Sequence, residues 1–185
     1  MKVYFTASLT GKNKYIKNYE IIMATIDKLG YKLLSKNVLA RKPEDILNET
    51  PDEAYSYYKK MVNWIKEADI VVAEVSYPSL GIGYEVALSL EEGKQVIVLY
   101  TGEREPYLLE SSQNDRLQIM EYKLENLSQT IESSLNIARQ QLDLRFTLLL
   151  PPHIVQFLNN LAEKEKIPRS VFIRNLIEGE MKKRK

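Results

Sequence analysis

Hydrophobic and polar positions follow two different periods along the first 140 residues. Short runs rich in Val, Ile and Leu are typical of buried strands, and longer segments with apolar residues every three or four positions are typical of helices. The predicted strands are Val3–Ala7, Tyr31–Leu34, Ile70–Val75, Val96–Tyr100 and Leu117–Tyr122, the last of them at a sheet edge. The predicted helices are Tyr15–Leu29, Thr50–Glu67, Tyr84–Glu92 and Leu124–Gln140, and the polar stretch Ala40–Asp52 is predicted to be a surface loop.

Strands that alternate with helices predict an α/β fold with a doubly wound, mostly parallel sheet. Ligands of such folds bind beyond the carboxyl ends of the strands. The loops that reach this crevice are SLTGK after the first strand, SYPSLGIGYE after the third and TGEREP after the fourth.

The last forty residues follow a different pattern. Arg145–Leu150 reads as one strand that ends at two prolines, and two helices are predicted after it, over His153–Lys166 and Ser170–Lys182. A single strand cannot stand alone, so it must pair with the sheet or with another chain. We therefore predict two domains, residues 1–142 and residues 143–185.

Charge also divides the chain. Residues 145–185 contain nine Lys and Arg against four Asp and Glu, a net charge of +5, so that residues 1–144 carry −4 and the whole chain +1. A basic segment favours an anionic partner, although charged terminal residues are often only a solvated end.

Composition limits the chemistry. The 185 residues are 44% hydrophobic and include no cysteine and one histidine, His153. These values exclude a disordered chain, a disulfide scaffold, a thiolate zinc site and a cysteine nucleophile. We expect no metal and no cofactor, and any catalysis falls to carboxylates. No apolar run is long enough to span a membrane and no signal peptide begins the chain, so we expect a cytoplasmic protein.

The segment GIGYE holds the strongest chemical signal. It follows the buried strand Ile70–Val75, so the backbone N–H groups around Gly81 and Gly83 and the start of the next helix can face an anion or a sugar. Glu85 is expected in the first turn of that helix. A carboxylate there could act on a ligand, or it could simply stabilise the helix N-terminus.

Residues 2–140 resemble the nucleoside 2-deoxyribosyltransferase superfamily, and most closely its branch of 2'-deoxynucleoside 5'-phosphate N-hydrolases. The resemblance rests on VYFTASLTG, on NWIKEADIVVAEVSYPSLGIGYEVA and on GKQVIVLY. It implies that Glu85 is the nucleophile that attacks the anomeric carbon of a deoxyribose and that Tyr4 orients this carboxylate. That chemistry is the one that retaining glycosidases use.

The same resemblance implies that Ser8 and Ser79, with Gly81 and Gly83, line the pocket for sugar and phosphate. Each position also has an ordinary structural interpretation. Tyr4 could be core packing, and the two serines could be helix caps or turn residues.

The chain departs from the family at the helix before the central strand. Family members carry there an aspartate that protonates the base or assists the nucleophile, and this chain has Met61, which can do neither. No carboxylate lies three or four positions away on that helix face. Glu74, at the end of the third strand, could replace the acid only if its side chain faces the crevice. Asp115 lies near the position of a phosphate-binding serine that a second subunit contributes in the family, where a carboxylate would repel a phosphate.

The C-terminal segment resembles the ribbon-helix-helix DNA-binding family, in which two chains pair their strands and interlock their helices. The resemblance rests on RFTLLLP followed by HIVQFLNNLAEKEKIPRSVFIRNLIEGEM. It implies that Arg145 and Thr147 face DNA and that Ser170, as the cap of the second helix, holds a phosphate. Leu149 occupies an outward position where a polar residue is usual, so the module could instead serve only for dimerisation.

Three hypotheses follow. The leading one is a homodimeric regulator that binds a nucleoside or nucleotide and, through its tail, DNA, with hydrolysis weakened or lost. The second is an active N-glycosidase or deoxyribosyltransferase that uses Glu85. The third is a partner-binding module, similar to an antitoxin, in which Leu149 faces another protein.

Overall fold

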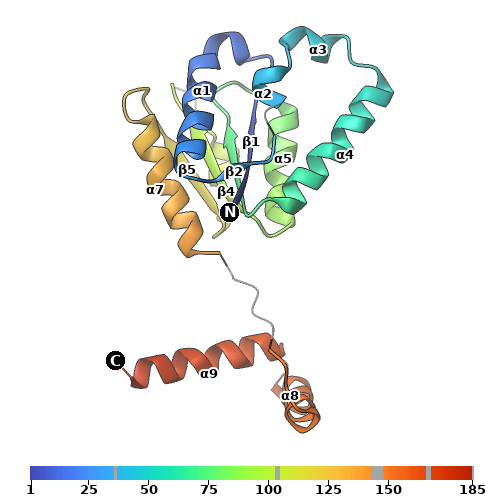
Figure 1. Cartoon of the computed structure of the whole chain (residues 1–185), viewed down its shortest axis with the longest axis vertical. Helices are drawn as coiled ribbons and strands as arrows, with labels where there is room; N and C mark the ends of the chain where they lie inside the picture. The colour runs from blue at the N-terminus through green and yellow to red at the C-terminus, as the bar shows by residue number, and fades with distance from the viewer. Residues whose placement is uncertain (36, 103–104, 143–147, 166–167, 185) are drawn as a thin grey trace. The chain divides into compact units, whose positions relative to one another are not determined.

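The computed structural model describes residues 1–35, 37–102, 105–142, 148–165 and 168–184 of the chain. They divide into two compact units, Met1–Asp143 and Leu144–Lys185. The first unit contains a β-sheet with its covering helices, and the second contains two helices (Figure 1).

The sheet consists of five parallel strands in the order β2-β1-β3-β4-β5. Their bounds are β1 Lys2–Ala7, β2 Lys32–Leu33, β3 Ile70–Glu74, β4 Gln95–Tyr100 and β5 Leu117–Glu121. The predicted α/β fold is confirmed, and β5 lies at the edge as predicted. The chain order reverses between β1 and β3, and the crevice of such a sheet lies beyond the carboxyl ends of these two strands.

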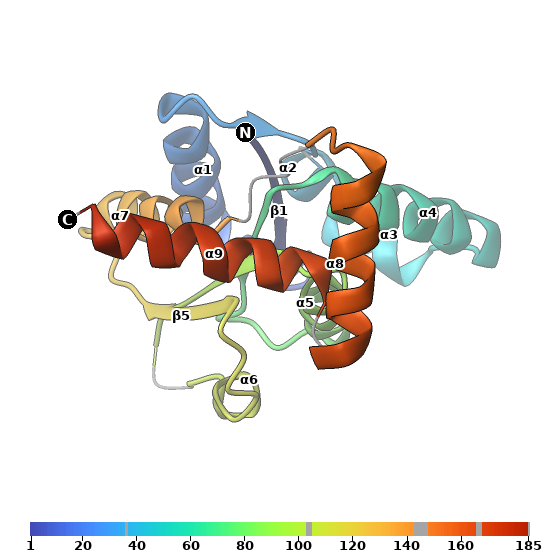
Figure 2. The same ribbon diagram turned by 90° about the horizontal axis from the view of Figure 1, so that it is seen from below.

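Helices cover both faces of the sheet. Figures 1 and 2 show α1 (Lys12–Lys28) beside α7 (Leu127–Gln140), and α4 (Pro51–Glu67) and α5 (Leu80–Glu91) lie across the sheet from them. Side chains of β1 alternate between the two layers, because successive residues of a strand point to opposite faces. Val3 and Phe5 pack with α1 and α7, whereas Tyr4 packs with α4 and α5.

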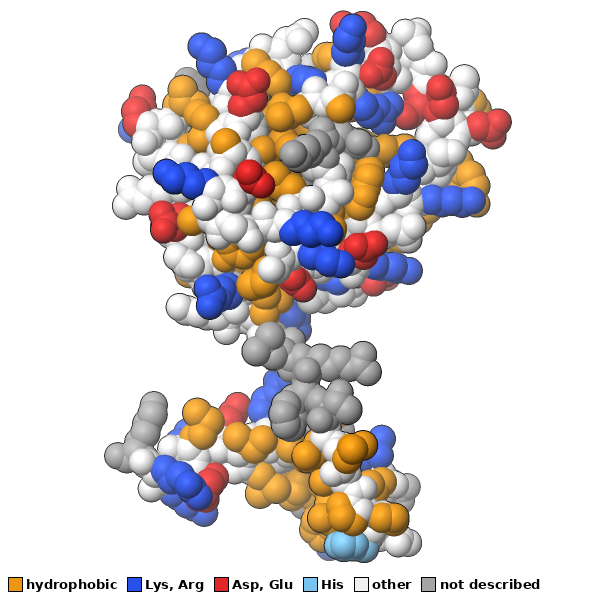
Figure 3. Space-filling view, viewed as in Figure 1, with side chains coloured by type: hydrophobic (Ala, Val, Ile, Leu, Met, Phe, Trp, Pro, Cys, Tyr) orange, Lys and Arg blue, Asp and Glu red, His pale blue; other side chains and the backbone are white. Residues whose placement is uncertain are grey.

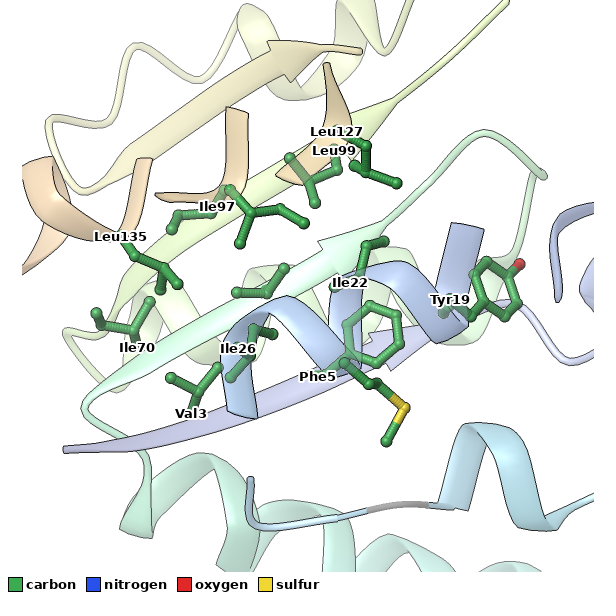
Figure 4. Packing of buried hydrophobic residues seen from close by; sticks show 14 of the residues in the cluster. Val3, Phe5, Tyr19, Ile22, Ile26, Ile70, Ile97, Leu99, Leu127 and Leu135 are labelled. Carbon is green, nitrogen blue, oxygen red and sulfur yellow. The ribbon is translucent and has the colours of Figure 1, made fainter. Parts of the chain in front are cut away.

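Two hydrophobic cores result from this arrangement. Figure 4 shows the first, in which strand side chains such as Ile70 and Ile97 meet Ile22 and Ile26 of α1 and Leu135 of α7. The second joins Tyr4, Val71 and Val98 of the strands to residues of α4 and α5, among them Met61, Ile65 and Val86. Every position of β3 and β4 is buried, which explains why these strands read as continuous apolar runs.

Several element boundaries differ from the prediction. The helix α5 begins at Leu80, four residues before the predicted start, because the Ser79 hydroxyl caps it by accepting a hydrogen bond from the Ile82 N–H at 3.5 Å. The predicted loop over residues 40–52 contains the helix α3 (Pro43–Leu47). Its first turn is fixed by Pro43 and by the Asp45 carboxylate, which accepts a hydrogen bond from the Lys42 N–H at 2.7 Å.

The other helices of the first unit are short. They are α2 (Asn37–Ala40) before α3, and α6 (Tyr107–Glu110) between β4 and β5. Among the residues that the model describes, no helix is long and apolar enough to cross a membrane.

The second unit consists of α8 (Pro152–Glu165) and α9 (Arg169–Lys183), close to the two predicted helices. Leu148–Leu150, the described part of the predicted strand before them, form no strand. Residues 145–147 lie outside the described residues. Hydrophobic side chains gather on the surface of these helices in Figure 3. The exposed ones include Ile154, Phe157, Val171, Leu176, Ile177 and Met181.

Candidate functional site

The centre of the candidate site is a hydrogen bond between two buried side chains from different elements. The Tyr4 hydroxyl on β1 donates to Oε2 of Glu85 on α5 at 2.8 Å, and the two side chains are 1% and 5% exposed. Residue 4 reaches Glu85 because β1 and α5 both pack in the second core, on the same face of the sheet. Glu85, the predicted nucleophile, and Tyr4, the predicted orienting residue, are therefore in contact.

Burial dominates the electrostatics of this pair. Loss of water raises the pKa of the Glu85 carboxyl, and hydrogen bonds from Thr6 and Tyr4 lower it only in part. Burial and then the charge of Glu85 raise the pKa of Tyr4 well above its usual value, so the phenol stays a neutral donor. The arrangement holds a carboxylate in one orientation inside a poorly hydrated site.

Glu85 lies in the second turn of α5, because the helix begins earlier than predicted. The first turn contains no acidic residue, so the alternative that Glu85 serves as a first-turn acid is wrong. Gly81 and Gly83 fall inside the helix instead of in a loop before it.

The two glycines have no evident role in the fold. Neither has a positive φ, a Cβ at Gly81 would meet only Ser79 Oγ at 3.8 Å, and a Cβ at Gly83 would meet nothing within 4 Å. Glycine inside a helix costs about 0.5–1 kcal/mol relative to alanine. Close approach of a ligand to this bare helix surface would explain why they are there.

Aromatic side chains form a wall beside Tyr4. The Trp64 ring stacks on Tyr4 at 5.8 Å between centroids, and the Tyr57 ring meets Trp64 edge-on at 6.2 Å. The Arg41 guanidinium lies 5.0 Å from the centre of the Tyr57 ring. Burial and the charge of Glu85 raise the pKa of Tyr57 to about 12.

Two cavities of the described residues are lined by side chains of the elements that carry the site, but not by Tyr4 or Glu85. One of about 630 Å³ is lined by Tyr57, Arg41 and acidic side chains of α3 and the start of α4. The other, of about 440 Å³, is lined by Ser79, Gly83, Tyr77 and residues of α6. Tyr57 lines the first cavity, and Ile82 and Gly83, on the same helix as Glu85, line the second.

The two predicted serines both have structural partners. Ser79 caps α5, as its alternative interpretation held, and it also lines the smaller cavity. Ser8 is 1% exposed, and its hydroxyl accepts from the Gly11 N–H at 3.2 Å and lies 2.9 Å from the Thr10 hydroxyl. Ligand contact by Ser8, Ser79, Gly81 and Gly83 stays a prediction.

Glu74 does not share the site with Glu85. Its side chain accepts a hydrogen bond from Tyr122 at 2.9 Å, and its neighbour Tyr19 belongs to the first core, on the α1 and α7 side. The odd-even alternation of β3 places Val71 and Ala73 toward Glu85, and Glu74 away from it. Glu74 therefore cannot replace the aspartate whose position Met61 occupies. Met61 itself is a core residue, 4% exposed.

Of the three predicted DNA-binding residues, the structure describes only Ser170. Arg145 and Thr147 lie outside the described residues. Ser170 is not the cap of its helix, because α9 begins at Arg169 with Pro168 at the N-cap. Proline fixes an extended backbone there, which lets the helix start one residue earlier than predicted.

Sequence reasoning missed several aromatic side chains. Trp64 was expected to be core or pocket wall, but Tyr57 was not singled out, although the spacing of seven residues places both on one side of α4. Tyr19 and Tyr122 lie 103 positions apart, and no local pattern indicated that both approach Glu74.

The chain is similar to known proteins over most of its first unit. The family model described as nucleoside 2-deoxyribosyltransferase matches residues 3–137. The "Putative 2'-deoxynucleoside 5'-phosphate N-hydrolase 1" of Thermofilum pendens is 38% identical over 108 residues, which are 56% of this chain and 71% of that protein. The 5-hydroxymethyl-dUMP N-hydrolase of Tetraodon nigroviridis is 28% identical over 136 residues, which are 71% of this chain and 95% of that protein.

A solved structure shows the same fold. The CMP N-glycosidase of Clostridium botulinum superposes with a TM-score of 0.50 at 16% identity, covering 74% of this chain and 99% of that one.

Proposed function

Because the chain belongs to the nucleoside 2-deoxyribosyltransferase family, we propose that it hydrolyses the N-glycosidic bond of 2'-deoxynucleoside 5'-phosphates. The observation that carries the proposal is the buried Glu85 carboxylate, held by the Tyr4 hydroxyl at 2.8 Å. We prefer this function to that of a regulator, because the two similar proteins described above carry the names of N-hydrolases.

In the first step, one carboxylate oxygen of Glu85 attacks the anomeric carbon of the deoxyribose. A C–O ester bond forms as the C–N bond breaks, and the base leaves with the electron pair of that bond. The hydrogen bond from Tyr4 fixes one oxygen of Glu85, so the other is directed to the reacting carbon. Exclusion of water strengthens every interaction with the positive charge that develops on the sugar.

The departing base must then take up a proton. Met61 carries none, and Glu74 lies on the other face of the sheet. The phenol of Tyr57 lines the larger cavity, but with a pKa of about 12 it is a weak donor. We therefore expect base release to be slower than with a carboxylic acid at position 61, by about 10²–10⁴-fold.

In the second step, water attacks the anomeric carbon of the ester. The carbon forms a new C–O bond to water, the Glu85 carboxylate leaves, and the proton from water passes to solvent. The products are the free base and 2-deoxyribose 5-phosphate. A sugar or nucleoside acceptor in place of water would give transfer instead.

The N-terminus of α5 suits the phosphate or sugar of this substrate. The N-terminus of a helix attracts anions, and Gly81 and Gly83 place no side chain over the first turn of α5. Ser79 at the cap and Ser8 in the loop after β1 would add hydroxyl donors. Tyr57 and Trp64 offer apolar faces to the base.

The test is chromatography of free base from a panel of 2'-deoxynucleosides and their 5'-monophosphates. We expect release from at least one monophosphate, loss of at least about 10³-fold in rate for Glu85→Gln, and no change for Glu92→Gln, an exposed residue at the end of the same helix. Release that survives in Glu85→Gln would refute the role of Glu85. No release from any compound would refute the activity.

A second candidate function concerns the second unit. Its helices expose a set of apolar side chains that a segment of about forty residues cannot bury by itself, and its net charge is +5. We propose that two copies of the chain associate through these helices and that the basic residues bind DNA phosphates. Light scattering should give a dimer that Phe157→Asp dissociates. Absence of salt-sensitive binding to any DNA, the chain's own promoter included, would exclude the regulator.

A further inference from the structure

The buried carboxylate of Glu74 lies at the same end of the sheet as the candidate site and has no part in the proposed chemistry. Glu74 is the last residue of β3, paired with Ala7 of β1 and Leu99 of β4, and it is fully buried. Its Oε2 atom is buried without a hydrogen-bond partner among the described residues. An uncompensated carboxylate oxygen in the core costs stability, so its presence calls for a role.

The other oxygen of Glu74 holds the loop that leads to α5. Oε1 accepts hydrogen bonds from the Ser76 N–H at 3.2 Å and from the Ser76 hydroxyl. The Ser76 hydroxyl oxygen in turn accepts from the Thr101 N–H at 2.8 Å, at the end of β4. Ser76 begins the loop that contains Ser79, so Glu74 fixes the start of this loop and connects it to the next strand.

A second connection reaches the loop after β1. The Tyr19 hydroxyl donates to the Ser8 carbonyl oxygen at 3.1 Å and is also close enough to Glu74 to lower the pKa of its carboxyl group by hydrogen bonding. The phenolic proton is donated to Ser8, and the Tyr19 hydroxyl lies beside the Glu74 carboxyl group. The Glu74 side chain therefore supports the phenol that holds the Ser8 loop.

The two loops also contact each other directly. A Cβ added at Gly11, in the Ser8 loop, would lie 2.4 Å from the Cβ of Tyr77 in the loop after β3. Displacement of one loop is therefore transmitted to the other. Both loops carry residues expected to contact the substrate, while Glu74 itself lies on the opposite face of the sheet from Glu85.

We propose that Glu74 is a positioning residue of the crevice, whose buried carboxylate holds the loops of Ser79 and Ser8 through Ser76 and Tyr19. Its loss then weakens substrate binding more than the chemical step, because Tyr4 and Glu85 keep their contact on the other face. The kinetic part of this inference rests on the proposed function. The structural part does not, since it concerns the two loops in the free protein.

Protonation of Glu74 should have the same effect as its removal. Burial raises the pKa of this carboxyl, and hydrogen bonds from Ser76 and Tyr122 offset the increase only in part. The titratable groups of the described residues that face it are Tyr19 on α1 and Tyr122 after β5, and both phenols stay neutral because their pKa values are raised. The carboxylate thus becomes protonated at a higher pH than an exposed glutamate does, and the loops lose a charged acceptor below that pH.

The experiment compares Glu74→Gln with the wild-type protein and with Glu92→Gln, an exposed control. Glutamine keeps one acceptor oxygen for Ser76 and Tyr122 but has no charge. We expect KM for base release to rise about tenfold or more, as for loss of a charge-assisted hydrogen bond, with kcat within about threefold. In the wild type KM should rise toward acid pH, and this dependence should disappear in Glu74→Gln.

Amide hydrogen exchange provides a readout that needs no activity. The amides of residues 8–11 and 76–80 should exchange faster in Glu74→Gln than in the wild type. Their exchange should be unchanged in Glu92→Gln. Tyr19→Phe removes the hydroxyl that donates to Ser8 and keeps the bonds between Glu74 and Ser76, so it should speed exchange in residues 8–11 more than in residues 76–80, and it serves if Glu74→Gln does not fold. Unchanged exchange in both segments would overturn the proposal even if the wild type releases no base. A loss confined to kcat would overturn it as well.

Discussion

Replacing Glu85 by glutamine should stabilise the protein at neutral pH while abolishing base release. Glutamine has nearly the same shape and keeps an oxygen for the Tyr4 hydroxyl, so the change removes the charge of a side chain that is 5% exposed. Burial raises the pKa of Glu85 in the folded state above that of the unfolded chain. The ionised form is therefore less favourable in the folded protein than in water.

The sign of the pH dependence follows from this shift. Below the unfolded pKa of about 4.5, Glu85 is protonated in both states and the wild type and the variant should unfold alike. As pH rises through the higher pKa of the folded state, the wild type loses stability relative to Glu85→Gln. Each unit by which the pKa is raised corresponds to about 1.4 kcal/mol. For a chain of this size, each kcal/mol moves Tm by about 2–4 °C.

The assay is thermal unfolding from pH 4 to pH 8 with Glu92→Gln as control, since Glu92 is the exposed C-cap residue of the same helix. The difference in Tm between Glu85→Gln and the wild type should be near zero at pH 4, grow with pH and then level off. The control should show no such growth. A variant that is less stable than the wild type at every pH would refute the argument that the buried charge is destabilising.

Three further predictions concern single substitutions. Met61→Asp should raise kcat for base release by about 10²-fold or more, because it supplies the missing acid, and should lower Tm, because residue 61 is 4% exposed. Gly83→Ala should stabilise the fold by about 0.5–1 kcal/mol in denaturant unfolding and raise KM, since a methyl group would cover the helix surface that is bare. Gly11→Ala should destabilise the protein by about 1–3 kcal/mol in the same measurement, because its Cβ would lie 2.4 Å from that of Tyr77. Equal activity in Met61→Asp, unchanged KM in Gly83→Ala or unchanged stability in Gly11→Ala would contradict the respective argument.

The sheet could be predicted from sequence because its central strands are buried on both faces. Runs such as Ile70–Val75 contain only side chains that a covered parallel strand accepts, apart from Glu74, and turn residues bound them clearly. The start of α5 was harder, because Gly81 and Gly83 are typical of loops and only the serine cap indicates the earlier start. The small helix α3 was missed since its polar residues show no apolar period.

Burial of both faces made β3 easy to find, but it also made the direction of the Glu74 side chain impossible to predict. When both faces of a strand are buried, its apolar residues alternate between two cores and the pattern does not distinguish them. Only the contacts with Tyr19 and Tyr122, which are remote in sequence, assign Glu74 to the face of α1 and α7. The predicted contact of Tyr4 with Glu85 required a resemblance to known proteins, because nothing local relates a strand residue to a helix residue 81 positions away.

Two buried carboxylates, Glu74 and Glu85, thus lie on opposite faces of one sheet, and burial raises the pKa of both. Neither has a cation as its partner among the described contacts, and hydrogen bonds from hydroxyl groups compensate each only in part. Selection for stability alone would replace such residues by neutral or apolar ones, since an unpaired buried charge is costly. Glu85 has a direct explanation as the nucleophile. Glu74 needs a different one, because its side chain faces away from Glu85 and its hydrogen bonds hold Ser76, in the loop that would bind the substrate. The two carboxylates therefore suit two different proposed tasks, with chemistry on the α5 face of the sheet and loop positioning on the α1 face.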